Sequence, residues 1–352
     1  MNLVEVLVIE PIGDADLRRI TAVDPRVHVV DARGWFDAEI RESWPAWTVH
    51  RYLGNRPCPP SSRAERDRLL ANAEIIFGGW PFPFELRRRA PRLRWFHQRP
   101  AGASNLQRSD LWGSDILVTT SRGHADIRPM AEYILAMFLH FARGLHHAYR
   151  DERRDHFEHR SYRPLLLQGK TVCVIGAGGI GRKVAKVCAD FGMRVVGTRN
   201  RVPPGAENPP GFDQLYTAER LPELLGESDF VAVCCQWTAA TNKLIGPQAL
   251  AAMRPETVLV NVARGEVVDE EALLAALDAG KLRGVGLDVY VGEFERTPNP
   301  RLWHHDRVLI TPHISAGTDR PLHRGIDVFC ANLRAYLEGE PLVNLIDWER
   351  GY

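Results

Sequence analysis

The chain has 352 residues, which is too long for one ordinary core and suits two domains of about 150 residues each. Its 45% hydrophobic and 25% charged residues are typical of a globular protein and argue against a disordered or membrane-embedded chain. The formal net charge of +1 provides no overall field for nucleic acid or an anionic membrane, so an anionic ligand must meet a local site.

The first third of the chain alternates short apolar runs with helical patterns. Strands are expected at 3–9, 27–31 and 74–77, and helices near 14–22 and 62–72. This alternation favours a parallel sheet that helices cover on both faces. The opening run contains an acidic residue and no basic leader, so it is interpreted as a strand rather than a signal peptide. No run approaches the eighteen apolar residues of a membrane span.

Residues 43–61 are rich in tryptophan and proline. They contain Trp44, Trp47 and four prolines, a pattern that appears too broken by turn-forming residues for regular structure. We interpret this segment as an ordered excursion or a lid.

A long helix is expected from 129 to 147, where apolar residues recur at helical spacing. We interpret it as the crossing between the two domains. The charged run that follows, at 150–163, is expected to be solvated surface.

The second half of the chain repeats the alternation of strands and helices. Its strands are expected at 171–175, 194–197, 230–234, 258–262, 284–289 and 307–310, with helices near 180–191 and 269–279. This order predicts a second doubly wound parallel sheet. A last helix near 318–338 is expected to return to the first domain. We therefore predict a first doubly wound domain of residues 1–122 plus 318–352, into which a second of residues 123–317 is inserted.

The sequence GAGGIG at 176–181 directly follows a buried strand and opens a helix. Gly176 permits a tight turn, Gly178 lets a pyrophosphate approach the backbone, and Gly181 allows close packing of the helix on the strand. Gly179 and Ile180 begin the helix, whose free N–H groups and positive dipole end favour phosphate. The pattern predicts a dinucleotide site, although glycines alone would also suit any tight strand-to-helix turn.

The end of the second strand in this domain distinguishes between the two nicotinamide cofactors. An acidic residue there would hydrogen-bond the adenosine ribose of NAD. The chain instead has Arg199, Asn200 and Arg201, and an arginine fork suits a 2′-phosphate. We predict a preference for NADP(H), with NAD(H) possible as a second cofactor. The alternative is that both arginines are ordinary solvent-facing loop residues.

Three motifs follow strands of the second domain: VNVARG at 260–265, GLDVYVGE at 286–293 and LITPHISAG at 309–317. With them, the chain resembles the D-isomer-specific 2-hydroxyacid dehydrogenases, and in particular glyoxylate and hydroxypyruvate reductases. The resemblance runs from the first strand into the last helix and is strongest from 170 to 317. It implies that residues 1–122 plus 318–352 form a flavodoxin-like substrate domain and that residues 123–317 form a Rossmann-type dinucleotide-binding domain.

The resemblance implies three catalytic residues, and the chemistry of reducing a 2-oxo acid suits each of them. The planar guanidinium of Arg264 can hold the carboxylate and polarise the ketone. His313 can donate a proton to the alkoxide, because histidine ordinarily titrates near neutrality, and Glu293 can orient the ring. Taken singly, the three would be a surface ion pair, a hydrogen-bonded histidine and a solvated carboxylate.

One segment departs from the family pattern. Phe294 stands where similar enzymes generally have proline, and the stretch between Glu293 and His313 is somewhat short. This leaves the geometry of the loop open, while the pairing of Glu293 with His313 is expected to persist.

The resemblance also implies further cofactor contacts. Asp288 is expected to accept a hydrogen bond from the nicotinamide carboxamide, the alternative being a structural role in a turn. Cys235 and Trp237 are expected to line the nucleotide groove, although the family commonly has a histidine-proline-leucine segment there. The remaining predicted cofactor contacts are His313 itself, Val262, Ala263, Ala316 and Gly317.

On the substrate side, residues 96–106 resemble the loop whose backbone N–H groups receive the substrate carboxylate. Ala101 and Gly102 occupy the donor positions, and Arg264 would also bind the substrate carboxylate. Gly78 and Gly79 are expected to supply further backbone, with Trp80 as an apolar wall. The alternative is that residues 77–83 form only a hydrophobic turn.

Sibling activities differ at particular residues. Formate dehydrogenases carry glutamine where Glu293 stands, and phosphite dehydrogenases generally carry lysine at the position of Ala101. A regulated phosphoglycerate enzyme would need a longer chain. Reduction of a small 2-oxo acid such as glyoxylate or hydroxypyruvate by NAD(P)H therefore fits best. Another small anion such as phosphite, or a corepressor-like scaffold that binds dinucleotide, stays open as an alternative.

The partners and the compartment follow from the same observations. The six cysteines lack CxxC spacing, so we expect reduced core thiols in a cytoplasmic protein rather than disulfides or a zinc site, and no bound metal. Similar enzymes dimerise through the region of the helix at 129–147, which implies a homodimer. No nucleic-acid or membrane partner is expected, and the two domains are expected to close over the acid.

Overall fold

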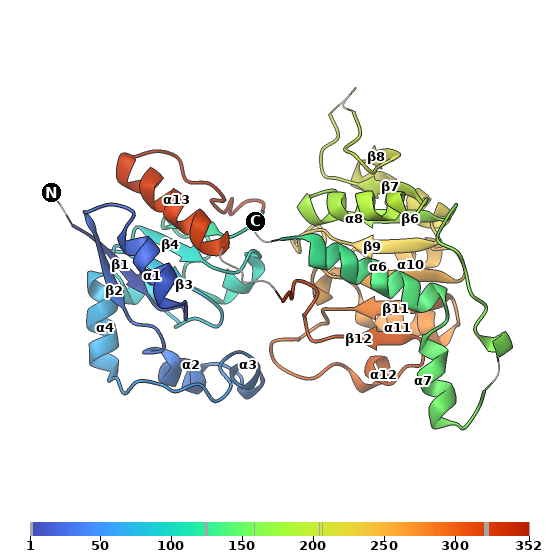
Figure 1. The fold of residues 1–352 in the computed structure, drawn as a ribbon, viewed down its shortest axis with the longest axis horizontal. Helices are drawn as coiled ribbons and strands as arrows, with labels where there is room; N and C mark the ends of the chain where they lie inside the picture. The colour runs from blue at the N-terminus through green and yellow to red at the C-terminus, as the bar shows by residue number, and fades with distance from the viewer. Residues whose placement is uncertain are drawn as a thin grey trace. The chain divides into compact units, whose positions relative to one another are not determined.

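The computed structural model describes residues 3–123, 126–157, 159–203, 205, 207–319 and 324–351. Its contacts divide the chain into two compact units (Figure 1). The first unit comprises Met1–Ala125 and Arg320–Tyr352, and the second comprises Asp126–Asp319. The expected last helix is observed as α13, Arg324–Glu338, while residues 320–323 of that expectation lie outside the described part of the chain.

The first unit contains a parallel five-stranded sheet in the order β2-β1-β3-β4-β5. The sequence predicts three of these strands, namely β1 (Val4–Val8), β2 (Val27–Asp31) and β3 (Ile75–Gly78). It does not predict β4 (Trp95–Gln98) or β5 (Leu117–Thr120), which have only four residues each. The order is that of flavodoxin-like sheets, so the predicted fold class is confirmed for this unit.

Helices cover both faces of this sheet. Successive residues of a strand point to opposite faces, and each face has its own apolar cluster. Val6 and Val8 pack with Phe329 of α13 and Ile20 of α1 (Asp14–Thr21). Leu7 and other residues on the opposite face pack with a second group of helices: α2 (Asp37–Ser43), α3 (Ala46–Tyr52), α4 (Arg63–Asn72) and α5 (Leu86–Arg89).

The expectation that residues 43–61 lack regular structure is wrong, because α3 lies within them. Trp44 anchors this segment in the core. Its side chain is buried, its Nε1 donates to the carbonyl of Phe82 at 2.7 Å, and its ring stacks on Phe84. The four prolines of this segment all lie outside α3, one at its N-cap and three beyond its end, so they do not interrupt the helix.

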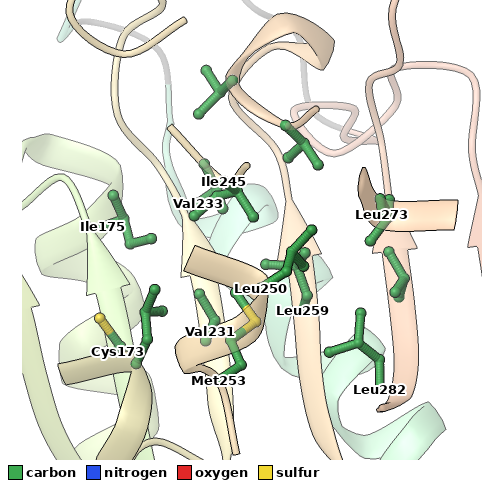
Figure 2. Close-up of a cluster of buried hydrophobic side chains, with 14 of the residues drawn as sticks. Cys173, Ile175, Val231, Val233, Ile245, Leu250, Met253, Leu259, Leu273 and Leu282 are labelled. Atoms are coloured by element: carbon green, nitrogen blue, oxygen red, sulfur yellow. The ribbon is translucent and has the colours of Figure 1, made fainter. Parts of the chain in front are cut away.

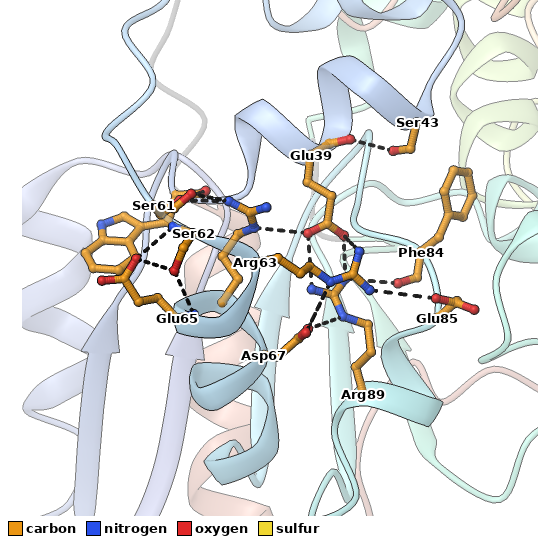
Figure 3. Close-up of polar contacts among 12 residues, drawn as sticks. Glu39, Ser43, Ser61, Ser62, Arg63, Glu65, Asp67, Phe84, Glu85 and Arg89 are labelled. Atoms are coloured by element: carbon orange, nitrogen blue, oxygen red, sulfur yellow. Dashed lines mark hydrogen bonds and ion pairs between the residues drawn. The ribbon is translucent and has the colours of Figure 1, made fainter.

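A buried ion-pair network joins α2, α4 and α5 (Figure 3). Glu39 of α2 accepts from Arg66 of α4 and from Arg89 of α5, each at 3.1 Å. All three side chains are at most 10% exposed. At the start of α4, Ser62 and Glu65 form a reciprocal capping box, which satisfies backbone donors at the first turn of the helix. These helices are therefore held to one another by charged groups as well as by apolar contacts.

The second unit contains a parallel seven-stranded sheet in the order β12-β11-β10-β9-β6-β7-β8, the arrangement of Rossmann-type sheets. The predicted strands are observed as β6 (Thr171–Ile175), β7 (Arg194–Thr198), β9 (Phe230–Val233), β10 (Thr257–Asn261), β11 (Leu282–Leu287) and β12 (Val308–Ile310). The three-residue β8 (Gln214–Tyr216) is not predicted by the sequence. The two parallel sheets confirm the predicted fold class.

Two apolar layers cover this sheet. Cys173 and Ile175 of β6 face the layer drawn in Figure 2, which contains α9 (Leu221–Glu227), α10 (Pro247–Ala252) and α11 (Glu270–Asp278). Val172 and Val174 face the other layer, which contains α6 (Arg128–Ala142) and α8 (Gly179–Asp190). A short helix, α12 (Pro300–Trp303), precedes β12.

The single helix expected at 129–147 is two helices. α6 ends at Ala142, and α7 runs from His146 to Arg153. Gly144 between them has φ +72°, and the N–H groups of Gly144 and Leu145 donate to the carbonyls of Phe141 and His140 at 3.2 and 2.9 Å, so a glycine C-cap ends α6. A Cβ at Gly144 would also lie 2.5 Å from the carbonyl oxygen of Tyr162. Within the described residues, no helix has the length and apolar character needed to cross a membrane.

Candidate active site

The glycine-rich turn between β6 and α8 is fixed by close backbone contacts. Gly176 has φ +98°, and a Cβ there would lie 2.7 Å from the Cα of Cys235. A Cβ at Gly181 would lie 2.1 Å from the carbonyl oxygen of Gly176. By contrast, a Cβ at Gly178 would meet nothing within 4 Å. The backbone at Gly178 and the start of α8, with Gly179 and Ile180, are therefore open to a phosphate group, which fits a dinucleotide.

The end of β7 lies beside this turn, because the backbone N–H groups of Gly176 and Ala177 donate to the carbonyl of Thr198 at 3.1 and 3.0 Å. Arg199, Asn200 and Arg201 follow and are exposed. Residues 197–203 contain no carboxylate. The end of this strand therefore presents positive charge where a ribose-binding acid would stand.

The end of β9 forms another wall of the turn. The backbone of Cys235 is the group that packs against Gly176, and burial raises the pKa of the Cys235 thiol to about 12. The thiol is therefore protonated near neutrality and acts as a small packing group. Trp237 is partly buried, and its Nε1 donates to Asn242 at 3.1 Å.

Arg264 follows β10 in a turn that Asn261 holds in place. The Asn261 side chain accepts from the N–H of Ala263 at 2.9 Å and donates to the carbonyl of Arg264 at 2.8 Å. A Cβ at the next residue, Gly265, would lie 2.1 Å from the carbonyl carbon of Tyr290, so the turn packs directly against the segment after β11. Sequence reasoning missed Asn261; its position as the last residue of a buried strand is the signal that could have found it. Val262 and Ala263 are buried.

Asp288, directly after β11, organises the loop that carries the predicted proton donor. Its fully buried carboxylate accepts from the Thr311 hydroxyl at 2.7 Å and from the backbone N–H groups of Ile314 and Ser315 at 2.8 and 2.9 Å. The hydroxyl of Tyr133, on α6, lies 2.6 Å from that of Thr311. Asp288 thus has a clear structural role, which the sequence left as the alternative, while its predicted contact with the nicotinamide stays a prediction.

Glu293 and His313 are in contact. The Nδ1 of His313 lies 3.2 Å from each carboxylate oxygen of Glu293, whose side chain is 4% exposed against 29% for the histidine. The backbone N–H of His313 donates to the carbonyl of Asp288 at 2.9 Å, and its φ is +55°. Among the described residues, nothing hydrogen-bonds Nε2 of this ring. The phenyl ring of Phe294 lies 6.5 Å from the imidazole, centroid to centroid, so phenylalanine at this position does not separate the pair.

The three motifs meet at one edge of the sheet. The N–H of Asp288 donates to the carbonyl of Asn261 at 3.0 Å, which joins the turn of Arg264 to the segment of His313. β10, β11 and β12 are neighbouring parallel strands, and ligands of such sheets bind outside the carboxyl ends of the strands. Ala316 and Gly317 are exposed just after this segment. In the described part of the chain, no cluster of His, Cys, Asp or Glu could hold a metal ion.

The predicted substrate residues of the first unit follow β3 and β4. Gly78 and Gly79 are closely covered, because a Cβ at Gly78 would lie 2.7 Å from the ring of Phe96 and one at Gly79 would lie 1.5 Å from a carboxylate oxygen of Glu10. Glu10 was not singled out by sequence reasoning. Residues Ala101 and Gly102 are exposed and partly buried, respectively, and the amide of buried Gln98 donates to the Gly102 carbonyl at 2.6 Å.

The chain is similar to known proteins in both sequence and fold. Residues 135–315 match the D-isomer specific 2-hydroxyacid dehydrogenase, NAD binding domain. The glyoxylate reductase of Thermococcus gammatolerans is 33% identical over 269 residues, which cover 74% of this chain and 78% of that protein. The D-3-phosphoglycerate dehydrogenase of Mycobacterium bovis is 33% identical over 78% of this chain, but the match spans only 52% of its own length.

A solved structure is similar over the whole chain. It is the D-isomer specific 2-hydroxyacid dehydrogenase from Xanthobacter autotrophicus Py2 in complex with NADPH and MES, with 26% identity, a TM-score of 0.75 and coverage of 100% of both chains. The domain match and the glyoxylate reductase likeness together show that this chain belongs to the D-isomer specific 2-hydroxyacid dehydrogenases, NAD(P)-dependent oxidoreductases that act on the CH–OH group.

Proposed function

We propose that this enzyme reduces a small 2-oxo acid of the glyoxylate and hydroxypyruvate class to the D-2-hydroxy acid, using NADPH. The observation that carries the proposal is the contact between His313 Nδ1 and the buried carboxylate of Glu293, at 3.2 Å. Such a pair fixes the ring and leaves Nε2 directed to a reacting group.

His313 is the proposed proton donor. With Nδ1–H donated to Glu293, the second ring nitrogen carries the proton that the ketone oxygen receives as it becomes a hydroxyl. The buried carboxylate compensates the positive charge of the imidazolium before transfer. When bound, the nicotinamide cofactor supplies the hydride for the ketone carbon. Asp288 acts on this step indirectly, by holding the loop that carries His313.

Arg264 is the proposed cation for the substrate carboxylate and the ketone oxygen. Asn261 binds both the N–H before it and the carbonyl of Arg264, so the backbone from which the guanidinium extends is fixed. A fixed cation costs no reorganisation when charge develops on the substrate oxygen. The predicted backbone donors of the first unit are Ala101 and Gly102. Gly78 and Gly79 are proposed to supply further backbone on the substrate side.

The proposed preference for NADPH over NADH rests on the end of β7. Arg199 and Arg201 are exposed there and residues 197–203 hold no carboxylate. Guanidinium groups bind a 2′-phosphate with charge-assisted hydrogen bonds, while a ribose hydroxyl pair is usually held by an acid. The proposed cofactor-binding set further includes the turn at Gly176–Gly181, Cys235, Val262, Ala263, Asp288, Ala316 and Gly317.

We also propose that the second unit is the dinucleotide-binding domain and the first the substrate domain, and that the protein is a cytoplasmic homodimer. All six cysteines are free thiols, which supports a reducing compartment. The proposed homodimer rests on the resemblance, since similar enzymes dimerise through the region of α6. Light scattering at micromolar concentration is expected to give the mass of a dimer, and a monomer would contradict this part of the proposal.

The reaction is tested by following NADPH oxidation with glyoxylate, hydroxypyruvate, pyruvate and phenylpyruvate, each repeated with NADH. We expect the two small acids glyoxylate and hydroxypyruvate to have the highest kcat/KM, and NADPH to be used better than NADH. Turnover of none of the acids with either cofactor would contradict the proposed activity. A higher kcat/KM with NADH would contradict only the cofactor preference.

A further inference from the structure

The first unit contains an ion pair at the point where ligands of its fold bind. In the order β2-β1-β3-β4-β5 the strand sequence reverses between β1 and β3, and ligands bind in the crevice outside the carboxyl ends of such strands. Glu10 follows β1, Gly79 follows β3 and Arg99 follows β4. Their neighbourhood is fixed by backbone hydrogen bonds from Glu10 to Phe77 at 3.4 Å and from Arg99 to Gly78 at 2.9 Å.

Glu10 and Arg99 form a close pair with unequal exposure. Arg99 Nη1 donates to Glu10 Oε1 at 2.7 Å, and the side chains are 42% and 13% exposed, respectively. Burial raises the pKa of Glu10, and the guanidinium of Arg99 opposes this rise. Arg56 and Asp37, the other charged groups that act on Glu10, are paired with each other at 2.8 Å. Arg99 is therefore the charged group that is hydrogen-bonded to Glu10. The exposed part of its side chain can contact a ligand.

Gly79 is the reason that this pair can form. The Glu10 carboxylate lies over the Gly79 backbone, where a Cβ would come within 1.5 Å of Oε2. Any other residue at 79 would displace the carboxylate and with it the orientation of Arg99. The glycine therefore makes room for the Glu10 side chain, a function that differs from the backbone donation expected from sequence.

The chemistry of the pair selects the kind of group that it can bind. A guanidinium has five N–H donors, of which one is given to Glu10, and a carboxylate has further lone pairs for a donor. The pair is neutral as a whole, so it offers little attraction to a second anion. A hydroxyl group donates one hydrogen bond and accepts others, which matches a donor and an acceptor held side by side.

Gln98, the residue before Arg99, also has an acceptor without a partner among the described residues. Gln98 is completely buried, and in the described part of the chain its Oε1 has no hydrogen-bond partner while its Nε2 is used to hold Gly102. Buried acceptors of this kind are normally satisfied, by an ordered water or by a ligand. The loop of the predicted substrate residues is thus built to receive a polar group.

We propose that Glu10 and Arg99 determine substrate specificity by binding the hydroxyl on the third carbon of a 2-oxo acid, so that hydroxypyruvate is preferred over pyruvate. This inference rests on the proposed function, because it assigns a substrate group to a region that the reduction of a 2-oxo acid requires. Arg99 donates a hydrogen bond to the hydroxyl oxygen, and Glu10 orients Arg99 and accepts a hydrogen bond from the hydroxyl group.

The test compares kcat/KM for hydroxypyruvate and pyruvate in the wild type and in Arg99→Met, Arg99→Lys and Gly79→Ala. The ratio of the two values within one preparation does not depend on the fraction of folded enzyme. Losing a hydrogen bond to a charged group predicts that the ratio falls about tenfold or more in Arg99→Met and Gly79→Ala. Arg99→Lys keeps a cation and is expected to restore part of the ratio. Arg87→Met removes an exposed arginine that pairs with Asp115 on the surface and serves as the control, with an unchanged ratio.

Each outcome has one meaning. A selective loss with hydroxypyruvate supports the specificity role. If both acids lose activity alike and the ratio stays within about twofold, the pair only holds the loop and the inference is overturned. If the wild type reduces neither acid, the proposed function itself fails, and that is seen before any variant is compared.

Discussion

Gly176 in the second unit and Gly79 in the first both follow a buried parallel strand, and both leave no room for a Cβ. At Gly176 the neighbour is backbone, namely that of Cys235, whereas at Gly79 it is the carboxylate of Glu10. The second unit thus shapes its site with main-chain contacts whose glycine pattern recurs in many chains. The first unit shapes its site with a pair of side chains far apart in sequence.

The same contrast extends beyond the glycines. In the second unit, Asn261 and Asp288 bind backbone groups and so set the course of the chain. In the first unit, Glu39 joins three helices through two arginines (Figure 3). A site held by main-chain geometry depends on residue size, and one held by ion pairs depends on charge. Variants that change only size or only charge separate these two dependences.

The largest effect on stability is expected from Glu39→Ala. The change leaves Arg66 and Arg89 buried at 8% and 5% exposure without their shared carboxylate, and breaking a buried pair in this way costs about 3–5 kcal/mol. Denaturant unfolding followed by circular dichroism measures the loss. Asp190→Ala in the second unit removes an exposed partner of Lys186 and is expected to cost less than about 1 kcal/mol. Equal losses in the two variants would show that burial of the charges does not matter.

A change of size at Gly176 is expected to have the next largest effect. Alanine there is strained by the positive φ and by the backbone of Cys235, at a cost of about 2–3 kcal/mol. Gly178→Ala adds the same methyl group where nothing lies within 4 Å, so the free energy of unfolding should change by less than about 1 kcal/mol. Isothermal titration with NADPH should nevertheless show weaker binding in Gly178→Ala. Wild-type affinity in that variant would mean that no phosphate approaches this turn.

His97 in the first unit is expected to make the free energy of unfolding depend on pH, by about 2 kcal/mol between pH 7 and pH 5. Burial lowers its pKa to about 3, and its ring hydrogen-bonds Thr119 at 2.8 Å. The unfolded state, with an ordinary histidine pKa of about 6.5, binds the proton more readily, so stability is lost as the pH falls below that value. Between pH 7 and 5 this amounts to about 2 kcal/mol. Denaturant unfolding at pH 7 and pH 5 measures this loss, which should be smaller by that amount in the non-titrating variant His97→Asn. If the free energy of unfolding falls equally in variant and wild type, the buried neutral His97 is not the cause.

The smallest effect, about tenfold, is expected from the double variant Arg199→Ala, Arg201→Ala. Loss of charge-assisted hydrogen bonds to a 2′-phosphate should raise the KM for NADPH by that factor, while the KM for NADH stays within about threefold. Steady-state kinetics with both cofactors measure the change. An equal rise for both would indicate that the arginines act on the shared phosphates or on folding.

The features that can be predicted from the sequence are those marked by a short local pattern. The turn at Gly176, the residues Arg264, Glu293 and His313, and most strands of both sheets follow from short stretches of chain. The missed strands β4 and β5 are as short as the predicted β3 and β9, but they contain buried polar residues such as His97 and Thr119 in place of a continuous apolar run. β8 has three residues, none of them fully buried. The helix expected at 129–147 is wrong at Gly144, where a glycine with positive φ ends α6, a local signal that the helical spacing of the apolar residues concealed.

The polar partners were the least predictable part of the site. Glu10 contacts Arg99 across 89 positions, and Tyr133 contacts Thr311 across 178. No local pattern records such pairs, since each residue alone resembles a solvated side chain. Trp44 shows the same limit in the core, because its hydrogen bond to Phe82 joins residues 38 positions apart.

The proton-donor role of His313 is the centre of this account, and the turnover of His313→Asn at pH 7 tests it most directly. We expect kcat with glyoxylate and hydroxypyruvate to fall at least about a hundredfold, while the free energy of unfolding stays near that of the wild type. The exposed His304 of the same unit provides the matched control, and His304→Asn should keep full turnover. Near-normal turnover in His313→Asn would contradict the account.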